Sequence, residues 1–306
     1  MIEVENLSKH YGTHQALKGI SFSADEGEVL GLLGPNGAGK TTTMRILTGY
    51  MPPSDGQASI AGFDVQDDSL EIRQRVGYMP ERIPLYPDMT VEGYLKFWAR
   101  LRGVKRPAQP VAEVLDRVNL SHRRKSLLRN LSKGMRQRIG LAQAIVHDPQ
   151  VVILDEPTIG IDPQQVIEVR ESVRALGEQH TVLFSTHILS EAEQVCDRVI
   201  IINQGRIVAE GTPETLRQTL QPGAQLFVII GGTEADSAQE LLTKIPGVES
   251  VLPQANGFAL RSQADLDLRP AISERVHGAG YTLLELRPVA MTLEDIFLDI
   301  VTREAD

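Results

Sequence analysis

The chain has 306 residues, of which 42% are hydrophobic and 23% are charged, which is typical of a globular protein with room for two domains. The net charge is −9, and residues 217–306 carry seven basic against thirteen acidic side chains, which argues against nucleic acid or an anionic lipid surface as a ligand of that part. We find no run of about 18–20 apolar residues of the kind that crosses a bilayer and no secretory leader, and the single cysteine, Cys196, excludes an internal disulfide.

The first thirty residues predict strands. Apolar and other residues alternate at 2–4 and again at 16–23, as in half-buried strands. Tyr11 lies between these segments, in a Ser-Lys-His-Tyr-Gly stretch. An aromatic ring at this place is able to stack on a nucleotide base, and a half-buried loop tyrosine is the ordinary alternative.

A glycine-rich loop follows a short apolar strand at 29–33. Residues 34–41 fit the pattern G-x-x-x-x-G-K-[ST] without a mismatch, and a helical segment at 41–47 follows. In this context backbone N–H groups surround phosphate oxygens, and the helix N-terminus adds partial positive charge. We expect Lys40 to reach the β- and γ-phosphates and Thr41 to offer its hydroxyl to Mg²⁺. The predicted phosphate-binding set is Gly34, Pro35, Asn36, Gly37, Ala38, Gly39, Lys40, Thr41 and Thr42.

The segment from 51 to 118 alternates turns with short elements. It predicts strands at 59–62 and 76–79, a helical turn at 69–74, and helices at 90–101 and 111–118. Thr90 is a good N-cap for the first of these two helices. We expect its apolar face to be core or a protein contact, and that face comprises Tyr94, Phe97, Trp98 and Leu101.

Acidic residues follow a strand that is wholly apolar. Residues 151–154 suit the centre of a parallel sheet, and Asp155 and Glu156 come directly after them. The carboxyl end of such a strand is where α/β sheets bind ligands. Asp155 is therefore expected to hold Mg²⁺, and Glu156 to orient and deprotonate an attacking water. His187 follows a similar strand at 181–185, at the same edge of the predicted sheet.

The remaining elements are helices and a second, smaller domain. Ser132 is expected to cap a helix that reaches 146, and Asp162 and Pro163 to open a helix that reaches 176. A hairpin at 198–209 precedes a boundary near 221, beyond which the order strand, helix, strand, strand, helix, strand predicts a ferredoxin-like α+β domain. A last helix is expected at 292–301. We see no phosphate loop, metal cluster or nucleophile–base pair in residues 221–306, so we expect an accessory domain.

Taken in order, the loop at 34–42, the Leu-Ser-Lys-Gly-Met stretch at 131–135, the strand with Asp155 and Glu156, and His187 resemble the nucleotide-binding subunit of an ATP-binding cassette (ABC) transporter. The resemblance covers roughly residues 1–215 and implies an α/β P-loop cassette in residues 1–220. Such a cassette has a mostly parallel core sheet, an antiparallel β subdomain and a helical subdomain. ATP and Mg²⁺ are the implied ligands.

The resemblance also implies roles for single residues. Tyr11 matches the aromatic residue that stacks on adenine, residues 34–42 match the Walker A loop, and Asp155 matches the Walker B acid. Glu156 matches the catalytic base, and His187 matches the switch histidine.

The resemblance also implies roles for residues of the signature stretch, the D-loop and the segment after the strand at 76–79. Ser132 and Gly134 match the signature residues that contact the γ-phosphate of a second subunit, and Asp162 lies in the D-loop. Glu81 replaces the usual glutamine; it is expected to ligate Mg²⁺ and to belong with Lys40 to the catalytic groups. Two copies of the chain would thus sandwich two Mg·ATP, head to tail.

Some features are similar to the exporter branch whose membrane subunits are of the ABC-2 type. These are Lys133 and Met135 in the signature, Glu81, and the appended C-terminal domain. The branch implies a peripheral protein on the cytoplasmic face of the membrane, partnered by a separate permease. Its docking surface is expected between 81 and 101, with Tyr86 and Met89 exposed. The alternatives are a soluble ABC ATPase acting on ribosomes or DNA, and a small-molecule kinase that shares only the P-loop.

Overall fold

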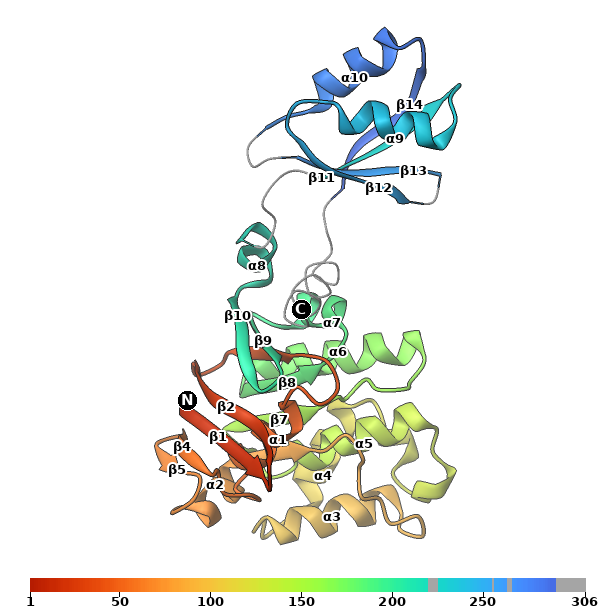
Figure 1. Ribbon diagram of the computed structural model, residues 1–306. Helices are drawn as coiled ribbons and strands as arrows, with labels where there is room; N and C mark the ends of the chain where they lie inside the picture. Colours follow the sequence, from red (N-terminus) through yellow and green to blue (C-terminus); the bar gives the residue numbers. More distant parts are fainter. Residues whose placement is uncertain (220–224, 255, 263–265, 290–306) are drawn as a thin grey trace. The chain divides into compact units, whose positions relative to one another are not determined.

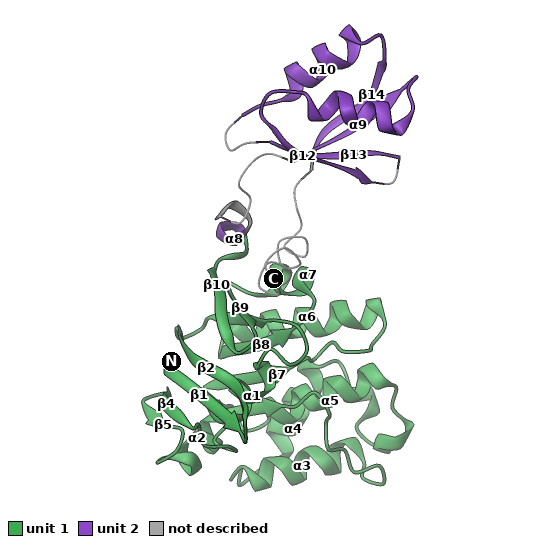
Figure 2. Cartoon of the chain, viewed as in Figure 1, with its two compact units in different colours: residues 1–213 green, residues 214–306 purple. Residues whose placement is uncertain are grey.

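The computed structural model describes residues 1–219, 225–254, 256–262 and 266–289 (Figure 1). The chain divides into two compact units, residues 1–213 and residues 214–306 (Figure 2). The helix expected at 292–301 lies outside the described residues. Among the helices of the described ranges, none has the length and apolar character needed to cross a membrane.

A six-stranded sheet forms the centre of the first unit, with strand order β10-β9-β3-β8-β7-β6. The five strands from β9 to β6 run parallel, and β10 pairs with β9 in the antiparallel sense. All residues of β3, β7 and β8 are buried, as expected for strands that are covered on both faces. The bounds are β3 Val29–Leu33, β6 Val76–Met79, β7 Val151–Asp155, β8 Thr181–Thr186, β9 Arg198–Asn203 and β10 Arg206–Gly211.

Helices cover this sheet, and a second sheet packs beyond one of them. Helices α5 (Lys133–Ile145), α6 (Pro163–Gly177) and α7 (Leu189–Val195) contact one another in series and pack against β6, β7, β8 and β3. Helix α1 (Lys40–Leu47) contacts β7 and also strands of the second sheet. Helix α7 was not predicted: it has seven residues, and no side chain caps its first turn.

The second sheet is antiparallel, with order β2-β1-β4-β5. Its strands are β1 Ile2–Tyr11, β2 His14–Ala24, β4 Asp55–Ile60 and β5 Phe63–Asp64. The prediction for β4 was wrong at both ends, because Gly56 belongs to the strand and residues 61–62 form the turn. At Gly56 (φ 81°) a Cβ atom would lie 2.3 Å from the carbonyl oxygen of Asn6, so a side chain has no room there. Asn6 lies where the pairing of β1 with β4 shifts register, between Glu5 and Ser8.

The helical part of the first unit comprises α2 Ser69–Arg75, α3 Val91–Leu101 and α4 Ala108–Arg117. As predicted, Thr90 caps α3, with its hydroxyl accepting a hydrogen bond from Gly93 N. The expected apolar face is only partly core. Tyr94 is fully buried and Trp98 half-buried, whereas Phe97 is 42% and Leu101 is 62% exposed.

The second unit is a ferredoxin-like sandwich, as predicted. Its sheet has the order β12-β13-β11-β14, and every neighbouring pair is antiparallel. The core joins residues of α9 and α10 to the sheet, among them Leu242, Ile272 and Leu260. Its elements are β11 Gln225–Gly231, α9 Ala235–Thr243, β12 Val248–Gln254, β13 Gly257–Ser262, α10 Arg269–Gly278 and β14 Thr282–Val289, and α8 Pro213–Thr219 precedes them where the two units divide.

Candidate active site

The loop between β3 and α1 is built to receive an anion. Gly39 is the N-cap of α1 at φ 115°, a conformation that favours glycine, and a Cβ atom there would lie 2.7 Å from Leu17 Cδ2. Among the described residues, no side chain caps the N-terminus of α1, and the first turn of the helix contains no acidic residue. The first N–H groups of the helix are therefore available to phosphate oxygens.

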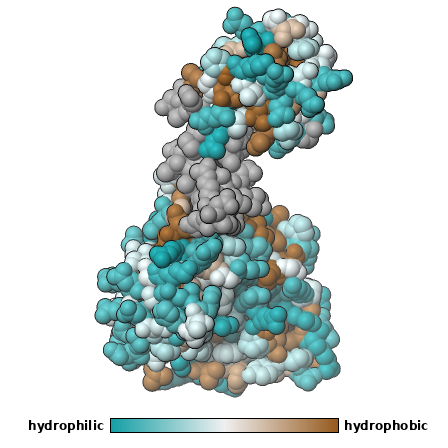
Figure 3. All heavy atoms as spheres, in the orientation of Figure 1, coloured by the Kyte–Doolittle hydropathy of each residue, from teal (hydrophilic) through white to brown (hydrophobic). Residues whose placement is uncertain are grey.

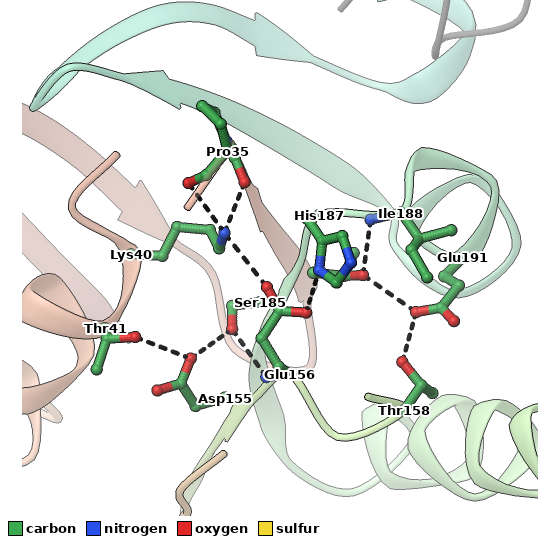
Figure 4. A network of polar contacts seen from close by, with 12 residues as sticks. Pro35, Lys40, Thr41, Asp155, Glu156, Thr158, Ser185, His187, Ile188 and Glu191 are labelled. Carbon is green, nitrogen blue, oxygen red and sulfur yellow. Dashed lines mark hydrogen bonds and ion pairs between the residues drawn. The ribbon is translucent and has the colours of Figure 1, made fainter. Parts of the chain in front are cut away.

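Lys40 lies at the start of α1 and is buried. Its Nζ donates to the carbonyl oxygen of Gly34 at 2.6 Å and pairs with Glu156 Oε1 at 3.2 Å (Figure 4). The ammonium group is thus held across the mouth of the loop. A phosphate that enters the loop competes with Glu156 for this charge, because both are anionic oxygen ligands.

Asp155 ends β7 beside the same helix. Ser185 Oγ donates to Asp155 Oδ1 at 2.8 Å, and Thr41 Oγ1 lies 3.4 Å from the same oxygen. Burial raises the pKa of Asp155, and these two hydrogen bonds oppose that rise.

The oxygens of Thr41 and Asp155 fit a magnesium ion. A hydroxyl and a carboxylate are hard ligands, and Mg²⁺ is usually held by one or two carboxylates together with phosphate and water oxygens. Within the described ranges no group of three or more His, Cys, Asp or Glu residues forms an all-protein metal cage. The arrangement therefore suits an ion that arrives with a nucleotide.

Glu156 follows Asp155 in a strained conformation. Its φ is 50°, unusual for a residue other than glycine, and its N–H donates to both the carbonyl oxygen and the hydroxyl of Ser185, at 3.2 and 3.0 Å. Glu156 Oε2 lies 2.7 Å from Nδ1 of His187, whose side chain is 42% exposed. The carboxylate is thus held between Lys40 and a histidine that borders solvent (Figure 4).

Three other predicted residues form a separate neighbourhood around Gln165. Ser132 caps α5 by accepting from Met135 N at 3.2 Å, and Asp162 caps α6 by accepting from Gln165 N at 3.1 Å. Gly134 is buried against the side chain of Gln165. Within the described residues, none of these three contacts the P-loop cluster through a hydrogen bond or ion pair.

The two remaining predicted residues lie at exposed positions. The ring of Tyr11 is 44% exposed at the end of β1, and its hydroxyl lies 2.9 Å from Met51 Sδ. Glu81 follows β6 and is exposed. Its negative charge contributes, after burial, to the raised pKa of Asp155.

Ser185 is a site residue that sequence reasoning missed. It is the cross-strand partner of Asp155 in the β7–β8 register, and its hydroxyl serves both Asp155 and Glu156. Only the relative register of two parallel strands places it there, and nothing in the motif pattern carries that information.

Comparison with known proteins identifies the family of this chain. Residues 17–159 match the sequence profile of the ABC transporter family. The linearmycin resistance ATP-binding protein LnrL of Bacillus subtilis (strain 168) is 40% identical over 235 residues, which is 76% of each chain. The Nod factor export ATP-binding protein I of Burkholderia orbicola (strain AU 1054) is 37% identical over 306 residues, covering 99% of this chain and 97% of the relative.

Solved structures give the same result. An ATP-binding subunit of an ABC transporter superposes with a TM-score of 0.65 at 33% identity, covering 72% of this chain and 92% of that chain. The dimeric structure of MJ0796, a bacterial ABC transporter cassette, superposes with a TM-score of 0.63 at 25% identity, covering 69% and 98%. The chain belongs to the ABC transporter family and is an ATP-binding subunit with ATPase activity.

Proposed function

We propose that this subunit drives export through a separate membrane permease of the ABC-2 type, as a peripheral protein on the cytoplasmic face of the membrane. The relative named for Nod factor export supports an export role. The observation that carries the hydrolytic part is the contact chain from Lys40 through Glu156 to His187. It joins the phosphate loop to a carboxylate base and to a solvent-facing histidine.

The chemistry follows from these contacts. Lys40 and the N–H groups of the loop stabilise the charge of the transferred phosphoryl group, and Glu156 takes a proton from the attacking water. His187 holds the Glu156 carboxylate in place. Thr41, Asp155 and Glu81 would hold Mg²⁺, which, when bound, neutralises charge on the β- and γ-phosphates. Tyr11 would stack on the adenine.

The site is completed by a second copy of the chain. Ser132 and Gly134 lie in the separate neighbourhood around Gln165, so their proposed contact to a γ-phosphate is made across a head-to-tail dimer. The dimeric form of the MJ0796 cassette supports this arrangement. Asp162, which caps α6 in the same neighbourhood, belongs to the same dimer surface.

The second unit is proposed to be an accessory domain that supports dimer contacts or regulation. The domain boundary predicted from the sequence, near residue 221, lies just beyond α8, whereas the second compact unit begins at residue 214. Within its described residues this unit contains no phosphate loop, and no group of three metal-ligating side chains.

The permease is proposed to dock where α3 meets the loop after β6. A cavity of about 380 Å³ opens there, and neither of its two arginines, Arg45 and Arg102, has an ion-pair partner among the described residues. Figure 3 shows hydrophobic surface along the lower edge of the first unit, where Figure 1 places α3. The cavity is lined by Arg45, Tyr50, Tyr78, Pro80, Pro84, Trp98, Arg102 and Gln143.

An exposed aromatic cluster lies beside this cavity. Tyr86 is 49% exposed and meets the ring of Phe97 edge-on at a centroid distance of 6.0 Å. Met89 was expected to be exposed as well, but it is half-buried, because its carbonyl oxygen accepts from Leu128 N and ties the loop down. A short permease helix with aromatic or aliphatic anchors and an acidic side chain fits this combination.

The experiment is affinity purification of the tagged chain from detergent-solubilised membranes, followed by ATPase assays with and without the recovered membrane protein. We expect a multi-span protein to copurify and to stimulate turnover. Stimulation by ribosomes or DNA, with no membrane partner recovered, would support the soluble alternative instead.

A further inference from the structure

A buried polar cluster adjoins the site without touching the P-loop. Thr158 Oγ1 donates to Glu191 Oε2 at 2.6 Å, and Thr186 Oγ1 donates to the same oxygen at 3.1 Å (Figure 4). All three side chains are buried, and Glu191 is only 3% exposed. Among the described residues no cation forms an ion pair with Glu191. Burying a carboxylate costs free energy unless it is hydrogen-bonded or paired, and here two hydroxyls supply the hydrogen bonds.

The cluster joins the two loops that carry the reacting pair. Thr158 lies two residues after Glu156, in the loop that follows β7, and Thr186 is the last residue of β8 and directly precedes His187. Glu191 lies in the first turn of α7. One carboxylate oxygen thus holds both loops at once, on the side of the Glu156–His187 contact that is remote from Lys40 (Figure 4).

Secondary contacts stiffen the histidine loop. Ile188 N donates to Thr186 Oγ1 at 3.0 Å, and Glu191 N donates to the carbonyl oxygen of Ile188 at 3.2 Å. The loop between β8 and α7 is therefore held by hydrogen bonds within its own residues, in addition to the link through Glu191 to Thr158. This closure helps to fix the His187 ring, because its side chain is 42% exposed and meets Glu156 through one nitrogen.

We propose that Glu191 is a positioning residue for ATP hydrolysis: it clamps the loop after β7 to the loop after β8, so that His187 meets Glu156. The inference rests on the proposed role of that pair. The strained backbone of Glu156 makes the clamp necessary, since a sparsely populated conformation persists only where its surroundings over-determine it. Loss of the clamp would let the loops separate, and displacements of about 1 Å at a reacting group cost on the order of 100-fold in rate.

The test is a double-mutant cycle with Glu191→Gln and His187→Ala, measured as single-turnover ATP hydrolysis by the full chain. Glutamine has the shape of glutamate but presents a weaker acceptor to two hydroxyl donors. We expect Glu191→Gln to lower the hydrolysis rate about tenfold or more in the wild-type background and less than about twofold in the His187→Ala background. The KM for ATP should change less than about twofold, because no group of the P-loop moves.

Two further variants keep the test decisive if Glu191→Gln folds poorly. Thr158→Val removes one donor and should reduce the rate with the same dependence on His187, whereas Thr158→Ser keeps the hydroxyl and should restore it. Glu171→Gln, at an exposed carboxylate of α6, is the matched control and should behave as wild type.

Equal fold losses in both backgrounds, or a Glu191→Gln rate within about twofold of wild type, would overturn the clamp. Either result is distinguishable from failure of the proposed function, because if the proposed function failed, Glu156→Gln itself would turn over normally.

Discussion

Replacing Glu156 with glutamine is expected to separate ATP binding from ATP hydrolysis. The carboxylate has two partners: Lys40, 3.2 Å from Oε1, and His187, 2.7 Å from Oε2. Glutamine keeps the size of the side chain but removes its charge and its ability to take a proton.

The two expected effects have different sizes and directions. Loss of a general base lowers turnover by about 10²–10⁴-fold. Binding responds differently, since the attraction between unit charges about 4 Å apart is on the order of 4 kcal/mol at an effective dielectric of about 20, before desolvation is subtracted. In Glu156→Gln this attraction no longer holds Lys40 away from a phosphate, so the Kd for ATP should stay the same or fall.

Three measurements check this reasoning: single-turnover hydrolysis, equilibrium binding of a fluorescent ATP analogue, and size-exclusion chromatography with and without ATP. The variant should bind ATP, fail to hydrolyse it and accumulate as an ATP-dependent dimer. Glu178→Gln, an exposed carboxylate near the end of α6, serves as the control. A Glu156→Gln protein that remains monomeric and turns over normally would refute the role of this residue.

Four other predictions follow from the same structure. Lys40→Ala should abolish hydrolysis and weaken ATP binding in the fluorescence assay, because it removes the buried cation of the loop. Asp155→Asn should abolish Mg²⁺-dependent hydrolysis yet raise the Tm of the nucleotide-free chain at neutral pH: burial raises the folded-state pKa of Asp155, so its ionisation costs stability as pH rises from the unfolded value through the folded one. Truncation after residue 220 should leave an ATP-binding core with altered dimerisation, detectable by chromatography. Tyr86→Glu with Phe97→Glu should abolish permease-stimulated turnover but spare basal turnover, whereas Leu70→Glu, at an exposed position on α2, should leave both unchanged.

Much of the first unit was predictable because its signals are local. The apolar runs of β3 and β7 have no polar alternation, and this places them in the centre of a parallel sheet. The pattern at 34–41 specifies a loop whose glycines and lysine must be contiguous in the chain. Thr90, Ser132 and Asp162 were expected at helix starts, and the side chain of each accepts the capping hydrogen bond.

What could not be predicted depends on groups that meet only after folding. Gly56 reads as a turn residue, and its place in β4 follows from the irregular register of β1. Ser185 serves Asp155 and Glu156 through strand register, and Glu191 reaches Thr158 across 33 residues of sequence. Met89 is only half-exposed, and its backbone is bound to a distant segment, the turn at Leu128.

The central claim is that each catalytic site takes its P-loop from one copy of the chain and its signature serine from another. Mixing Lys40→Ala protein with Ser132→Arg protein tests this claim directly. In a mixed dimer one site contains both substitutions, and the other contains an intact Lys40 and an intact Ser132. We predict that neither variant hydrolyses ATP alone, that each restores activity to the other on mixing, and that Ser132→Arg monomers still bind ATP. A mixture as inactive as its separate components, formed from proteins that demonstrably associate, would contradict the shared site.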